Sequence, residues 1–174
     1  MSERIVTIFG TSRANRADAV YELASELGRQ LAESGFVIAN GGYGGTMLAA
    51  AQGAAEAGGK IIGVTCRVFG RGSANAYVSR EIVTNSLDER LDTLIRLGAG
   101  YVVLPGGTGT LLELAMVWEL KNKGFMDGHK PIILVGDFWK ALVDLMATDD
   151  AGSSGCVHQA AGAAEVRDIL TGCI

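Results

Sequence analysis

The sequence lacks most features that mark membrane, secreted or nucleic-acid-binding proteins. No apolar run approaches the roughly 18 residues needed to span a membrane. Basic residues are not in excess, and the net charge of −4 argues against non-specific nucleic-acid binding. The three cysteines, Cys66, Cys156 and Cys173, are odd in number, show no metal-ligand spacing and fit a reducing compartment. No signal peptide is expected, because Met1 to Arg4 leads straight into a strand-like run. We therefore expect a cytoplasmic protein that binds neither nucleic acid nor membrane.

Length and composition predict one globular domain over residues 1–174. Apolar residues make up 48% of the chain and charged residues 20%, which is a globular rather than a disordered composition. A chain of 174 residues is long enough to bury a substantial core. Prolines are few, only two, whereas the 25 glycines cluster at the ends of apolar runs.

Short apolar runs alternate with segments of helical periodicity. Strands are predicted at 4–9, 36–39, 60–65, 81–84, 101–104 and 130–135, and helices at about 17–34, 46–57, 86–97, 110–121, 139–146 and 163–170. Residues 66–80 form a long irregular segment, and 148–162 is loop-like. This alternation predicts an α/β fold: a single doubly wound, Rossmann-like domain with a mostly parallel sheet. Ligands bind such sheets at the carboxyl ends of the strands, where three glycine-bearing loops are predicted to lie.

One of these loops has the features of an anion site. A buried strand ends before Pro105, a glycine-rich turn follows, and a helix begins near Thr110. A helix N-terminus presents free backbone N–H groups and the positive end of the helix dipole. We therefore expect this loop to hold a phosphate, with Glu113 facing the same site and staying ionised beside the dipole. The alternative is a capping box from Thr110 to Glu113, in which the glutamate only satisfies a backbone N–H.

Arg90 is the second candidate. It lies on the predicted helix 86–97, which has Ser86 as its predicted N-cap, at the shoulder of the apolar face. No acidic residue lies three or four positions away, so the arginine has no local salt-bridge partner. Either it is a solvated surface arginine, or it directs a planar cation into the ligand pocket from a neighbouring helix.

Several common nucleotide-binding classes are disfavoured. The loop Gly41 to Gly45 is not a Gly-x-Gly-x-x-Gly fingerprint. By itself it is as consistent with a tight turn as with a ligand-binding loop. Strand 36–39 lacks the acidic residue that holds a dinucleotide ribose, and no Gly-Lys-Ser/Thr sequence occurs. Weaker candidates for holding an anion are Arg13, Arg16 and Arg71, whereas His129 and His158 are expected at the surface.

Three motifs together resemble the Lonely guy (LOG) family. The run Pro105-Gly-Gly-Thr-Gly-Thr-Leu-Leu-Glu113 matches the family's Pro-Gly-Gly-x-Gly-Thr-x-x-Glu signature. Phe9-Gly-Thr-Ser12 is similar to its first loop, and Asn40 to Met47 to its second glycine motif. Arg90 lies fifteen residues before Pro105, where the family places its essential arginine. The resemblance covers roughly residues 4–145.

The resemblance implies hydrolysis of the N-glycosidic bond of a nucleoside 5′-monophosphate, which is AMP-like or a cytokinin riboside monophosphate. Arg90 and Glu113 would be catalytic. The phosphate would be bound by Gly107, Thr108, Gly109 and Thr110, helped by Gly10, Thr11 and Ser12. The nucleotide pocket would be lined by Gly41, Gly42, Gly44, Gly45 and Met47. No metal or redox cofactor would be needed, and a homodimer or larger homo-oligomer is expected.

Some positions depart from the family pattern and leave the substrate open. They are Asn40, Thr46, Leu87, Leu91 and Met116, where the family usually has glycine, leucine, methionine, lysine and an acidic residue. A second class of function therefore stays open: a protein of the same fold that binds a nucleotide-like ligand without cleaving it, such as a molybdenum-cofactor carrier. A lysine decarboxylase is least favoured, because no pyridoxal-binding arrangement is recognisable.

Overall fold

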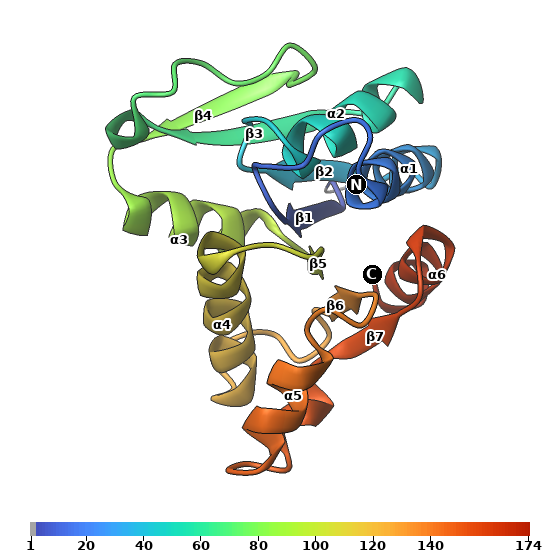
Figure 1. The fold of residues 1–174 in the computed structure, drawn as a ribbon, viewed down its shortest axis with the longest axis vertical. Helices are drawn as coiled ribbons and strands as arrows, with labels where there is room; N and C mark the ends of the chain where they lie inside the picture. The colour runs from blue at the N-terminus through green and yellow to red at the C-terminus, as the bar shows by residue number, and fades with distance from the viewer. Residues whose placement is uncertain (1–2) are drawn as a thin grey trace.

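The computed structural model describes residues 3–174 and contains one seven-stranded, all-parallel sheet (Figure 1). Met1 and Ser2 lie outside the described residues. They begin the stretch Met1 to Arg4, on which the expectation of no signal peptide rests. The strands are β1 (Ile5–Phe9), β2 (Val37–Asn40), β3 (Ile61–Cys66), β4 (Arg80–Thr84), β5 (Gly100–Val103), β6 (Ile132–Val135) and β7 (His158–Ala160). Their order is β4-β3-β2-β1-β5-β6-β7, and each neighbouring pair is parallel. The doubly wound α/β prediction is therefore confirmed.

Helices cover both faces of this sheet (Figure 1). They are α1 (Ala19–Glu33), α2 (Thr46–Glu56), α3 (Leu87–Leu97), α4 (Thr108–Asn122), α5 (Lys140–Ala147) and α6 (Ala163–Cys173), with short 3-10 turns at Arg67–Phe69 and Ser153–Cys156. Side chains of α1, α2 and α6 form one buried cluster with the sheet, and those of α3 and α4 form the other. Apolar strands buried on both faces explain why the strand sequences are continuous apolar runs rather than alternating ones.

Helices α1 and α2 pack unusually closely, because each presents a glycine to the other. A Cβ on Gly28 would overlap the carbonyl oxygen of Ala50, and a Cβ on Gly53 would overlap that of Ser25. The alanine-rich α2 is buried along the same face. Small side chains therefore bring these two helices, whose N-termini follow β1 and β2, to near backbone contact.

The segment 148–162, predicted as a loop, contains an edge strand. Strand β7 has only three residues and pairs with β6 from His158 to Ala160. Two of its three side chains are exposed, so it has no apolar run for a pattern to detect. Pairing at the sheet edge, rather than local preference, defines this strand.

The chain reverses its winding direction between β1 and β5. Strands β1 to β4 extend the sheet one way and β5 to β7 extend it the other way. The loops after β1 and β5 therefore diverge at their carboxyl ends, which is where doubly wound sheets bind ligands. Among the described residues, no helix has the length and apolar character to cross a membrane.

Candidate active site

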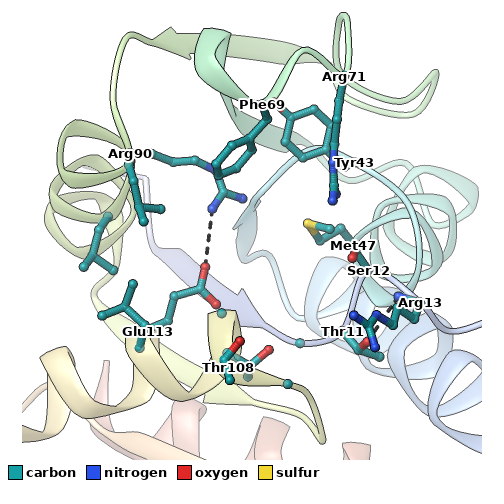
Figure 2. A pocket seen from close by; sticks show the side chains of 17 residues that line it. Thr11, Ser12, Arg13, Tyr43, Met47, Phe69, Arg71, Arg90, Thr108 and Glu113 are labelled. Atoms are coloured by element: carbon teal, nitrogen blue, oxygen red, sulfur yellow. Dashed lines mark hydrogen bonds and ion pairs between the residues drawn. The ribbon is translucent and has the colours of Figure 1, made fainter.

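A cavity of about 630 Å³ lies at this point of the sheet. Its volume is within the range of small-molecule sites. Five segments contribute its lining: Gly10–Arg13 after β1, Tyr43 and Met47 from the second glycine loop, Phe69 and Arg71 between β3 and β4, Leu87, Arg90 and Leu91 of α3, and Gly107–Thr110, Leu112 and Glu113 at the start of α4. Figure 2 shows Glu113 and Arg90 on one side and Arg13 and Arg71 on the other.

The floor of the cavity is the N-terminus of α4. Gly107 is the N-cap residue, and Gly107 to Gly109 are exposed to the cavity. The preceding Leu104 is held from both sides, because its N–H donates to Phe9 O at 2.9 Å and its carbonyl accepts from Trp139 Nε1 at 3.1 Å. The first N–H groups of a helix have no intrahelical acceptor and carry partial positive charge. The arrangement suits a phosphate group.

Glu113 does not form the capping box that Thr110-Leu-Leu-Glu113 suggests. Helix α4 begins at Thr108, two residues before Thr110, and its N-cap is a glycine without a side-chain bond. The Glu113 carboxylate instead lies 3.6 Å from Arg90 Nη1 (Figure 2). The true cap motif is on α3, where Ser86 Oγ accepts from the Glu89 N–H at 3.1 Å, as predicted.

Arg90 is buried and is not a solvated surface residue. Its side chain is 10% exposed, and its Nε donates to the carbonyl of Val64 at 2.8 Å. A Cβ on Gly41 would overlap Nη2 of this arginine, so the glycine leaves space for the guanidinium group. The ring centroids of Tyr43 and Phe69 lie 5.9 and 5.5 Å from its Cζ atom, within cation–π range. These contacts fix the cation that faces Glu113.

Glu113 has a strongly altered proton affinity. Burial raises the pKa of its carboxyl from 4.5 to about 7, although the Arg90 guanidinium opposes that shift by favouring the charged form. The simple expectation of a fully ionised glutamate beside a helix dipole is therefore wrong. Near neutral pH the group exchanges readily between its charged and neutral forms, as a general acid–base group must.

The first two glycine loops are joined to each other. The carbonyl of Thr11 accepts from both the N–H and the hydroxyl of Thr46, at 2.9 and 3.1 Å. Asn40 bridges its own loop, donating to Met47 O at 3.0 Å and accepting from the Gly42 N–H at 2.8 Å. Two of the departures from the family pattern, Asn40 and Thr46, therefore hold loop backbone.

The structure brings most predicted site residues together. Gly10, Thr11, Ser12, Met47 and the segment 107–110 all line the cavity with Arg90 and Glu113. The four glycines of the second loop do not line it. Gly41 lies beneath Arg90, a Cβ on Gly45 would overlap Thr11 O, and Gly44 lines a neighbouring hollow.

Sequence reasoning missed the aromatic side of the cavity. The sequence pattern places Tyr43 in a glycine loop without a role of its own and gives no role to Phe69. The only signal for Phe69 was the unusual length of the segment between β3 and β4. Of the weaker candidates, Arg13 and Arg71 line the cavity, whereas Arg16 does not. Within residues 3–174, no cluster of three His, Cys, Asp or Glu side chains is placed to hold a metal ion.

Fold and site together define a doubly wound α/β protein with a pocket at the switch point of its sheet, lined by a helix N-terminus and three arginines. The chain belongs to the SLOG cluster4 family, whose model matches residues 3–166, and the resemblance to the LOG family is confirmed. A cytokinin riboside 5′-monophosphate phosphoribohydrolase of Mycobacterium tuberculosis is 36% identical over 121 residues, which are 68% of this chain. Those residues are 63% of that relative, so the chain matches less than two thirds of its length.

Two solved structures resemble the chain over nearly its full length. The molybdenum cofactor binding protein of Rippkaea orientalis is 26% identical, with a TM-score of 0.81 and coverage of 99% of this chain and 98% of that one. The molybdenum cofactor carrier protein of Chlamydomonas reinhardtii is 29% identical, with a TM-score of 0.78 and the same coverage. The fold is therefore shared by relatives named as enzymes and by relatives named as carriers.

Proposed function

We propose that this chain hydrolyses the N-glycosidic bond of a nucleoside 5′-monophosphate and releases the free base and ribose 5-phosphate. The observation that carries the proposal is the buried Arg90–Glu113 pair, which faces the same cavity as the N-terminus of α4. Arg13, Arg71 and Arg90 line the cavity with one carboxyl group, so an anionic ligand is favoured. The name of the M. tuberculosis relative supports the same reaction.

The groups that line the cavity support this reaction. With the phosphate at Gly107 to Thr110, the sugar lies beside Glu113. Water forms a bond to the anomeric carbon as the C–N bond breaks, and the base leaves with the electron pair and takes a proton from solvent. The Glu113 carboxylate accepts the proton of the attacking water and stabilises positive charge on the sugar. The Arg90 guanidinium favours the ionised form of the carboxylate that this step requires, against the effect of burial.

A second function has its own support. Two solved relatives that match 99% of the chain are named as molybdenum-cofactor binding and carrier proteins. A carrier would use the same anion-binding loop and would not need an acid–base group. Glu113 favours hydrolysis over carriage. When it is ionised, a buried carboxylate with a raised pKa destabilises the fold and repels an anionic ligand, which is a disadvantage for a protein that only binds that ligand.

Incubation with a panel of nucleoside monophosphates separates the two functions. We expect AMP or an N6-modified AMP to release free base, measured by chromatography. Glu113→Gln and Arg90→Ala should each lower kcat/KM at least about 100-fold, as is usual for loss of an acid–base or charge-stabilising group. Glu119→Gln, in an exposed pair on the same helix, is the matched control. Tight binding of a monophosphate without base release would establish the carrier function instead.

We also propose that α4 joins two copies of the chain. Leu111, Leu112, Ala115 and Met116 form an exposed apolar stripe on this helix. The stripe contains no charge, so a second copy related by a two-fold axis would match it. Leu112 also lines the cavity, and a partner there would close its mouth. Light scattering should show a dimer that Met116→Glu dissociates; a wild-type monomer would contradict this.

A further inference from the structure

The segment between β3 and β4 forms one wall of the cavity. We call residues 67–73 the strap. It begins with a 3-10 turn at Arg67–Phe69 and then presents Arg71 between Gly70 and Gly72, which have φ angles of 61° and 74°. These left-handed conformations favour glycine and turn the backbone sharply on either side of Arg71. Phe69 and Arg71 both line the cavity.

The strap is fastened at both ends to the second glycine loop. At its start, the Tyr43 hydroxyl accepts from the Cys66 N–H at 2.8 Å and donates to the Cys66 carbonyl at 3.2 Å. Beyond its end, the Asn75 side chain donates to the carbonyls of Gly42 and Tyr43 at 3.1 and 3.0 Å. Two anchored ends give the strap a defined position over the cavity, which a purely solvated loop would not need.

Two arginines enclose an aromatic pair at this wall. The rings of Tyr43 and Phe69 lie 6.1 Å apart between centroids. Arg90 approaches both rings from the Glu113 side, and the Cζ atom of Arg71 lies 5.6 Å from Tyr43 and 5.9 Å from Phe69. In Figure 2, Arg71 extends from the strap toward Met47. Unlike Arg90, Arg71 is exposed. Its guanidinium group can therefore move away from the two rings and contact a ligand.

We propose that Phe69 and Arg71 form the subsite for the base of the nucleotide. This inference rests on the proposed function for the class of ligand. A phosphate at the start of α4 and a sugar beside Glu113 leave the base to reach a further wall of the cavity. The strap offers an aromatic face and a planar cation, both of which stack on heteroaromatic rings. Phe69 and Arg71 are therefore specificity-determining residues.

The rival wall is aliphatic. Leu87 and Leu91 of α3 also line the cavity, near Arg90. Aliphatic side chains bury a base but do not stack on it, and they offer no hydrogen-bond donor to its edge. If the base bound there, truncating Leu87 would weaken nucleotide binding and truncating Phe69 would not.

Ribose 5-phosphate provides the discriminating comparison, because it carries the phosphate and the sugar without the base. Dissociation constants of AMP and ribose 5-phosphate are measured by calorimetry in the Glu113→Gln chain, so that AMP is not consumed. Phe69→Ala should weaken AMP binding about tenfold, since base–aromatic stacking contributes roughly 1–3 kcal/mol. Arg71→Ala should weaken it several-fold. Both variants should leave ribose 5-phosphate affinity within about twofold.

The controls keep this inference separate from the proposed function. Val68→Ala lies on the same strap, is 67% exposed and should change neither affinity. Equal weakening of AMP and ribose 5-phosphate by Phe69→Ala would overturn the inference, because it would mean that Phe69 only supports Arg90. Loss of AMP affinity in Leu87→Ala alone would overturn it as well. Binding of AMP that depends on Phe69, without base release by the wild-type chain, would overturn only the hydrolase.

Discussion

Replacing Glu113 with glutamine should stabilise the protein, and the gain should depend on pH. The folded state raises the pKa of this carboxyl from 4.5 to about 7 because burial disfavours the charge. Between these values the unfolded chain loses the proton while the folded protein keeps it, so wild-type stability falls as pH rises. At about 1.4 kcal/mol for each tenfold change in proton affinity, the full effect is roughly 3 kcal/mol above pH 7.

Glutamine has nearly the shape of the protonated acid and does not titrate. The free energies of unfolding of wild type and Glu113→Gln should therefore be similar near pH 4.5, and their difference should grow up to about pH 7 and then stay constant. Urea unfolding at half-unit pH intervals, with equal m-values, measures this difference. Glu119→Gln removes an exposed carboxylate from the same helix and should change stability by only a few tenths of a kcal/mol. A glutamine variant that is less stable than wild type at pH 8 would refute the reasoning.

Three further changes test other parts of the structure. Arg90→Met removes the cation that lowers the pKa of Glu113, so that pKa should rise. In chains that carry this change, the stability difference between Glu113 and its glutamine replacement should therefore reach half of its full value at a higher pH. Gly28→Val forces a side chain into the backbone of α2 and should lower the free energy of unfolding by about 1–3 kcal/mol, measured by urea unfolding. Asn75→Ala removes two hydrogen bonds to the second glycine loop; hydrogen exchange around Tyr43 should accelerate, whereas unchanged exchange would show that the strap does not depend on this anchor.

The sequence was sufficient for the fold because its strands are continuous apolar runs and its glycines mark their ends. It was also sufficient to select Arg90 and Glu113, although twenty-three positions separate them, because Arg90 has no acidic residue one helical turn away and Glu113 follows a glycine-rich turn at a helix start. It did not indicate β7, whose three residues are defined only by pairing with β6. It also could not indicate Phe69, because a segment without periodicity gives no information about which side chain faces a cavity.

The same limit applies to the proton affinity of Glu113. The helix-dipole argument considers only local sequence and favours an ionised group. The desolvation that raises the pKa of Glu113 depends instead on the walls of the cavity, and Arg90 opposes it through its charge; both come from segments distant in the chain. The glycines of the second loop also depend on segments distant in the chain. Gly41 makes room for an arginine, and Gly45 makes room for the backbone of Thr11.

Trp139 gives this protein an internal optical probe of the glycine-rich turn before α4. Its indole N–H donates to Leu104 O, one residue before the turn that leads into α4, and its side chain is buried. The other tryptophan, Trp118, donates to Ser153 O and does not line the cavity. In a Trp118→Phe chain, fluorescence therefore reports from a single indole. An anion that draws the turn toward itself would alter that hydrogen bond, so titrations could follow occupancy of the loop without a label or a chromogenic substrate.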